Sequence, residues 1–200
     1  GVPDLLESNP PYLYGFGVSQ TDSTQYDLTE TFLFFDLLSE LGIPLVNVTA
    51  GSPYYNPHIQ RPAYYPPSDG YLPPEDPLIG VARQMEVCRT LKQRYPHIAL
   101  VGSAFTYLQD FLPYVAQAVV REDWVDFVGL GRMVLSYPEL PLDLLNTGTL
   151  QKKKVCRTFS DCTTAPRNGM ISGCYPLDPY YKSRPEHATL LALKRAKRER

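Results

Sequence analysis

The sequence lacks a long apolar run and an excess of either charge. No run of nonpolar residues approaches the roughly 18 that a membrane-spanning helix needs, so we expect no membrane partner. Its 19 basic and 21 acidic side chains give a net charge of −2. Nucleic-acid binders normally carry a strong basic excess, so we expect no nucleic-acid partner either. The 44% hydrophobic composition is that of an ordinary soluble globular chain with one sizeable core.

Cysteine is scarce as well. Four cysteines in 200 residues do not make a disulfide scaffold, so reduced thiols in a cytoplasmic protein are the expectation. The N-terminus has neither Met nor the basic, apolar and small regions of a signal peptide. It begins in a loop-like stretch, residues 1–4, and we expect an upstream piece of the protein to precede it.

Three short apolar runs alternate with segments of helical period. The runs predict buried strands near residues 45–50, 98–102 and 125–130. The segments of helical period are residues 27–41, 76–91, 107–121 and 138–146. Each helix-plus-strand unit spans roughly 30 residues, which is the spacing of βαβ units around a parallel sheet.

Single residues sharpen these predictions. Asp27 and Glu30 have the spacing of a capping box, and Asp76 is followed by proline at the first helical position. Pro113 should bend the third helix or delay its regular start. Cys88 falls on an apolar helical face, which predicts a core filler and not a reactive thiol. The faces expected to point inward are Phe34, Leu37, Leu38 and Leu41; Leu78, Val81, Ala82, Met85, Cys88 and Leu91; and Leu108, Phe111, Leu112, Val115 and Val119.

Such an alternation occurs in doubly wound sheets and in (β/α)8 barrels. Long loops follow the carboxyl ends of the strands, as they do in barrels, so we favour an α/β fold that is the C-terminal part of a (β/α)8 TIM barrel with parallel strands. We assign residues 1–148 to this portion of the barrel. Residues 149–200 form an irregular, cysteine-containing tail that ends in a basic helix, whose charges are most simply a solvated face.

Two successive predicted strands end in glycine beside a polar side chain. One ends in Gly102-Ser103 and the next in Gly129-Leu130-Gly131-Arg132. Glycine lets a backbone approach an anion closely, and arginine offers a fork of donors that matches phosphate. Barrels often build a phosphate site from the loops after their last two strands. The spacing leaves an alternative open, in which these glycines only turn the chain and Arg132 makes a structural ion pair.

The same residues carry a resemblance to a known family. Val101-Gly102-Ser103, a helix, and then residues 126–132 resemble the last third of the Old Yellow Enzyme family of FMN-dependent NAD(P)H:flavin oxidoreductases, which includes the 2,4-dienoyl-CoA reductase branch. Residues 48–53 and 133–139 add to a similarity that covers roughly residues 27–182. The resemblance implies that the FMN phosphate is held by Gly102, Ser103, Ala104, Gly131 and Arg132. Many members have a second glycine where this chain has Ala104-Phe105, and a backbone N–H still serves there provided that the position needs no positive φ.

The resemblance also implies an activity. The whole enzyme would pass a hydride from NAD(P)H, the co-substrate, through FMN to an electron-poor alkene or a related small-molecule acceptor. The N-terminal half of the barrel would be the missing partner and would hold the catalytic acid, so we name no catalytic residue and expect the fragment alone to be inactive. Two alternatives stay open: a non-redox TIM-barrel enzyme that acts on a phosphorylated metabolite, and a non-catalytic barrel fragment.

The long loop at residues 52–76 follows a strand and should lie at the mouth of the active site. Its candidate substrate-side residues are Tyr54, Tyr55, His58 and Arg61, each of which could equally serve loop packing.

The tail carries part of an iron–sulfur motif. The reductase branch of the family has the pattern C-x2-C-x3-C-x11-C. Cys162 and Cys174 have the x11 spacing, but the two earlier positions fall on Val155 and Thr158, and Cys156 is one residue out of register. A four-iron cluster normally requires four thiolates, so these three candidate metal ligands favour remnants of a cluster site or structural thiols, with an intact iron–sulfur cluster as the open alternative.

Overall fold

The structure is a computed structural model that describes residues 16–22, 25–51, 57–64 and 71–198. The chain divides into two compact units. The first comprises the residues up to 62 together with 75–105 and 114–129, and the second comprises 63–74, 106–113 and everything from 130 onward.

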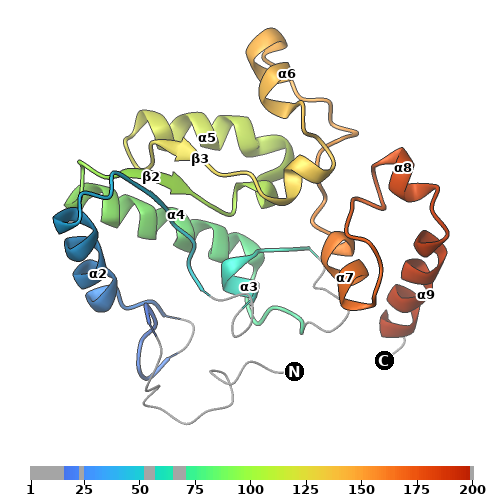
Figure 1. Cartoon of the computed structure of the whole chain (residues 1–200), viewed down its shortest axis with the longest axis horizontal. Coiled ribbons are helices and arrows are strands. Elements are labelled where there is room, and N and C mark those ends of the chain that lie inside the picture. The colour runs from blue at the N-terminus through green and yellow to red at the C-terminus, as the bar shows by residue number, and fades with distance from the viewer. Residues whose placement is uncertain (1–15, 23–24, 52–56, 65–70, 199–200) are drawn as a thin grey trace. The chain divides into compact units, whose positions relative to one another are not determined.

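The first unit contains a small parallel sheet and its helices (Figure 1). In chain order these are α2 (Thr29–Glu40), β1 (Leu45–Asn47), α3 (Pro57–Gln60), α4 (Pro77–Arg94), β2 (Ala99–Gly102), most of α5 (Leu112–Arg121) and β3 (Phe127–Val128). The strand order is β1-β2-β3 and both pairings are parallel. The prediction of three parallel strands separated by helices is therefore confirmed, within a mixed α/β fold.

The second unit is mostly helical. Its elements are most of the 3-10 helix η1 (Phe105–Phe111), the 3-10 helix η2 (Arg132–Leu135), α6 (Leu140–Thr147), α7 (Asp161–Arg167), α8 (Pro179–Lys182) and α9 (Glu186–Arg198). Ala165, Tyr175 and Leu190 are fully buried and form a core between α7 and α9. The tail is thus less irregular than its sequence predicts. No helix in the described part of the chain is both long and apolar enough to cross a bilayer.

Local chemistry explains where the helices begin and end. The Asp76 carboxylate accepts a hydrogen bond from the Leu78 amide at 2.8 Å and caps α4, as predicted. Pro113 lies at the second residue of α5 and delays its regular start, so that 3-10 turns precede the helix. Gly148 ends α6 with a left-handed φ of 67°.

The capping box predicted for α2 does not form, because the N-cap residue is Leu28, which makes no side-chain cap. Asp27 accepts hydrogen bonds from the amide and the hydroxyl of Thr29, at 2.9 and 2.7 Å. The Asp27 amide, however, donates to the carbonyl of Gly17 at 3.1 Å, which leaves no such role for the Glu30 side chain. A second difference lies in residues 52–76, where the one-turn helix α3 interrupts what the sequence predicts to be loop.

The inward face predicted for α2 is wrong. Phe34, Leu37 and Leu41 are 47%, 47% and 65% exposed, whereas Phe35 is buried. The reason is Tyr95, whose ring lies 5.2 Å from that of Phe35 and whose hydroxyl donates to the Phe32 carbonyl at 2.8 Å. These contacts with Tyr95 place Phe35 on the buried side of α2, and the more apolar stripe of the helix is therefore exposed.

Helical faces elsewhere are partly as predicted. On α4, Val81, Cys88 and Leu91 are buried, and Cys88 is confirmed as a core residue. Gln84 and Lys92 share that buried face although both are polar. Leu78, predicted to point inward, is instead exposed. Phe111 is 70% exposed, because it ends the 3-10 turns before α5 begins.

The two faces of the sheet differ in what covers them. Side chains alternate along a strand, and the pairings Leu45 with Ala99 and Val101 with Phe127 place these residues on one face. On the opposite face Ile98 and Leu100 are completely buried, with α4 alongside β2 (Figure 1). We call the face formed by Leu45, Asn47, Ala99, Val101 and Phe127 the open face, because Leu45 and Phe127 are 51% and 54% exposed.

The amino end of the sheet is fixed by one buried cation. Lys92 donates from Nζ to both carboxylate oxygens of Asp126 at 2.9 and 2.8 Å, and to the carbonyls of Pro96 and Ile98. The same carboxylate accepts a hydrogen bond from the Leu100 amide at 2.7 Å. Lys92 is 5% exposed, so its charge is satisfied inside the protein and ties α4 to β2 and β3.

Candidate functional site

The carboxyl ends of β2 and β3 approach each other so closely that both need glycine. A Cβ at Gly129 would lie 2.9 Å from the carbonyl oxygen of Gly102, to which the Gly129 amide donates a hydrogen bond at 2.8 Å. A Cβ at Gly102 would lie 2.9 Å from a methyl carbon of Val125 and 3.1 Å from the ring of Phe105. These glycines therefore serve close packing and do more than turn the chain.

The residues directly after Gly102 bring polar groups to the end of β2. The Ser103 hydroxyl donates to the side-chain carbonyl of Asn47 at 3.2 Å, so polar side chains from the ends of β2 and β1 meet on the solvent side. Ala104 then adopts a left-handed conformation with a φ of 74°. From the sequence, a residue other than glycine was allowed here on the condition that the position needs no positive φ, and this condition is not met. This position does have a positive φ, and alanine occupies it at a strain of about 1–2 kcal/mol.

Gly131 and Arg132 lie in the second unit. Gly131 precedes η2 and has open space where a Cβ would stand, so packing does not require a glycine there. Arg132 is half-buried, and its positive charge acts to lower the pKa of Cys156. The Cys156 amide donates to the Met133 sulfur at 3.3 Å, which brings the first tail cysteine against η2. That Gly131 and Arg132 share one anion with Gly102, Ser103 and Ala104 stays a prediction.

The three tail cysteines are free thiols, and Cys156 and Cys162 both act to raise the pKa of Cys174. Burial raises the pKa of Cys156 and raises that of Cys174 to about 11, so both are protonated near neutral pH. Among the described residues no three His, Cys, Asp or Glu side chains are grouped so that they could hold a metal ion. Three tail cysteines are one too few for a four-iron cluster, which normally needs four thiolates.

Beside Cys156 the backbone is strained in a way that the sequence did not predict. Thr158 and Ser160 have φ values of 54° and 61° although both are buried, and Gln109 combines a φ of 51° with a ψ of −117°. Arg157 donates to the Gln109 side chain at 2.6 Å and holds it in place. Conformations of this kind cost about 1–3 kcal/mol each and are concentrated at functional sites.

The substrate-side candidates have different environments. Tyr54 and Tyr55 lie outside the described residues. His58 is buried in α3, where burial is the main cause that lowers its pKa. Arg61 follows α3 directly and is half-buried.

An ion pair that the sequence analysis missed lies next to His58. Arg83 donates to both oxygens of Glu75, at 2.6 and 2.8 Å, and the two side chains are only 10% and 17% exposed. This hydrogen bond is the main cause that lowers the pKa of Glu75. Glu75 lies before α4 and Arg83 within it, so no helical pattern in the sequence marks the pair. The available signal was that Gln84, a polar residue, stands within the largely apolar stripe of α4.

Comparisons of the chain with protein-family models, with curated proteins and with solved structures found no match.

Proposed function

We propose that this chain is the FMN-phosphate end of a flavin-dependent NAD(P)H oxidoreductase of the ene-reductase type. The observation that carries the proposal is the carboxyl end of β2. There a glycine packed too tightly for a side chain is followed by the Ser103 hydroxyl and by the left-handed Ala104. A strand end with small residues and a positive φ presents backbone N–H groups to an anion.

The available donors suit a phosphate. The N–H groups and the hydroxyl at residues 102–104, with Gly131 and the Arg132 guanidinium, are the groups that would hold it. FMN, when bound, supplies the hydride relay between NAD(P)H and an electron-poor alkene or a related acceptor. His58 and Arg61 belong to the segment after β1 and would face the acceptor. We assign the proposed hydride transfer to the flavin and assign no step of it to the tail thiols.

The open face of the sheet supports a (β/α)8 TIM barrel as the framework. Parallel sheets are normally buried on both faces. Among the described residues, β1 and β3 each pair only with β2, which leaves one edge of each strand to another partner. We propose that the N-terminal half of the barrel pairs with these edges, encloses the open face and supplies the catalytic acid, in a cytoplasmic protein with reduced thiols.

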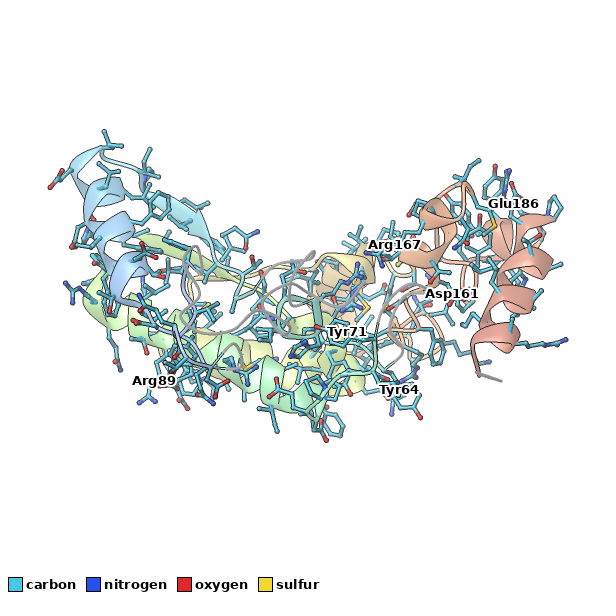
Figure 2. All side chains as sticks on the ribbon, turned by 90° about the horizontal axis from the view of Figure 1, so that it is seen from below. Tyr64, Tyr71, Arg89, Asp161, Arg167 and Glu186 are labelled. Atoms are coloured by element: carbon cyan, nitrogen blue, oxygen red, sulfur yellow. The ribbon has the colours of Figure 1, made fainter. Side chains whose placement is uncertain are left out.

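The test uses the whole protein expressed from its natural reading frame. It should be yellow, with a flavin absorbance band that NAD(P)H bleaches. Arg132→Ala should weaken FMN retention by about 1–3 kcal/mol, the scale of a lost charge-assisted hydrogen bond. Arg89→Ala, which removes a half-buried arginine of α4 (Figure 2), is the matched control and should leave retention unchanged.

Other outcomes would select the alternatives. Unchanged flavin occupancy in the Arg132→Ala variant would remove Arg132 from the phosphate site. A colourless protein that turns over a phosphorylated metabolite would be a non-redox barrel enzyme. A colourless protein without any turnover would favour the non-catalytic fragment.

A further inference from the structure

One face of α4 holds both ends of the segment that joins α3 to α4. Gly80, Arg83 and Gln84 have the spacing i, i+3, i+4, so they are neighbours on the helix surface. The groups that they contact belong, like them, to the first unit.

The end of the connecting segment next to α3 is held by Gln84, and Gly80 lets this end pack closely against α4. Gln84 is 2% exposed and donates from Nε2 to the last two carbonyls of α3, at 2.8 and 3.1 Å. A helix of one turn cannot satisfy these carbonyls itself. A Cβ at Gly80 would lie 3.5 Å from both the His58 carbonyl and the Pro62 ring, so α3 and the residues after it rest directly on α4.

The other end of the connecting segment, at residue 75 just before α4, is held by the bidentate ion pair of Arg83 with Glu75. The buried His58 ring lies within electrostatic reach of both partners, since Glu75 acts to raise its pKa and Arg83 acts to lower it. Residues 58 and 75 are therefore fixed at the same turn of the same helix.

We propose that Glu75, Arg83 and Gln84 are positioning residues that set Arg61 as the cation for the polar end of the acceptor. Arg61 lies one residue beyond the carbonyls that Gln84 holds, in the segment that follows the carboxyl end of β1. Ligands of parallel α/β folds bind at that end of the strands. A guanidinium there would pair with the electron-withdrawing oxygen of the proposed acceptor. We call the contacts made by Glu75, Arg83 and Gln84 the clamp. The assignment of an acceptor rests on the proposed flavin function, whereas the clamp does not.

The clamp is tested first in the chain itself, by chymotrypsin, which cleaves after aromatic residues. Tyr64 is 65% exposed and offers a cleavage site between the two held ends. Glu75→Gln and Arg83→Met should speed cleavage within residues 61–74, and Arg83→Lys should restore part of the protection. The control is Arg89→Met on the same helix, which breaks a half-buried pair with Glu86 and should leave cleavage unchanged. Cleavage at the native rate in both Glu75→Gln and Arg83→Met would overturn the clamp.

The role of Arg61 is tested in the flavin-loaded whole protein, with cyclohexenone as the acceptor. Arg61→Gln and Arg83→Met should raise KM for the acceptor by about 10- to 100-fold, the equivalent of a lost charge-assisted hydrogen bond, and should change kcat by a smaller factor. An unchanged KM in Arg61→Gln would overturn the assignment of Arg61. A whole protein without flavin would refute the proposed function and the acceptor role with it, and the cleavage experiment would still decide the clamp.

Discussion

The two faces of the β1-β2-β3 sheet are built from similar residues and have opposite environments. Leu100 on one face has no exposed surface, whereas Leu45 on the open face is 51% exposed. Both faces are largely apolar, so hydrophobicity alone does not say which one is covered within this chain. The difference lies in the connections, because α4 packs on one side of β2 and the described residues provide no equivalent on the other. An apolar face left in this state marks an interaction surface or a liability for aggregation.

The largest expected effect concerns association. Residues 1–200 expressed alone should bind FMN weakly or not at all, and should pair or aggregate through the open face and the sheet edges. Leu45→Lys combined with Phe127→Lys should return the chain to a monomer, because both side chains are already half exposed. Size-exclusion chromatography with a flavin spectrum decides it. A native chain that elutes as a yellow monomer would show that the open face needs no partner.

The next effect compares the same substitution on the two faces. Leu100→Ala should cost about 2–5 kcal/mol of unfolding free energy, since it empties a fully buried site. Leu45→Ala should cost less than about 1 kcal/mol in the chain alone, in proportion to the smaller area that it uncovers. Urea unfolding measures both. In the whole protein the Leu45→Ala cost should rise toward that of Leu100→Ala, and equal small costs in both proteins would refute a barrel interior at this face.

A third prediction concerns the pinned amino end of the sheet. Lys92→Met should cost about 2–3 kcal/mol, somewhat less than the loss of a fully buried pair, because the Asp126 side chain is 29% exposed. Burial acts to raise the pKa of Asp126, but the hydrogen bonds from Lys92 and the Leu100 amide outweigh it and hold this pKa below its ordinary value. The folded state therefore binds the proton less readily than the unfolded state. The stability from this carboxylate is present above the unfolded pKa, near 4, and is lost as the pH falls through the lower folded value.

This pH dependence gives the measurement. Urea midpoints followed from pH 6 down to about pH 2 should fall more steeply for the native chain than for the Lys92→Met variant. Parallel curves for the two proteins would mean that Lys92 does not stabilise the ionised carboxylate.

The smallest effect lies in the turn after β2. Ala104→Gly should stabilise the chain by about 1 kcal/mol, because glycine adopts the left-handed conformation without strain. Gly102→Ala, two residues earlier, should destabilise it, since a Cβ would stand 2.9 Å from Val125. The melting temperatures of the two variants should move in opposite directions. Shifts of the same sign would contradict the packing described for this turn.

Much of the first unit could be predicted from the sequence, because its strands are apolar runs and its helices carry proper start and stop residues. Asp76 before Pro77 is a signal that depends on neighbouring residues alone, and in the second unit Gly148 after α6 is another. The rotation of α2 could not be predicted, because it depends on Tyr95, which follows more than fifty residues later. The one-turn helix α3 is too short to show a period and depends on Gln84.

The candidate site likewise has a part that could be predicted from the sequence and a part that could not. Gly102, Ser103 and Gly129 were found because strand ends are legible in sequence. The contacts that shape their surroundings were not found, since Asn47 with Ser103 and Arg83 with Glu75 join segments that no local pattern relates. The strained conformations at Gln109 and Thr158 left no trace either, because neither residue type favours a positive φ.

The carboxylate of Asp126 has a consequence for exchange with solvent. β3 contributes only two residues to the sheet, and beside it the Leu100 amide donates to a side chain in place of a strand carbonyl. The strength of this hydrogen bond therefore depends on whether the Asp126 carboxyl group is ionised. The hydrogen-exchange protection of this single amide should therefore weaken once Asp126 is protonated, while that of Val48, which donates to a backbone carbonyl at 2.9 Å, should not. Leu100 thus becomes a residue-specific reporter of the charge at the amino end of the sheet.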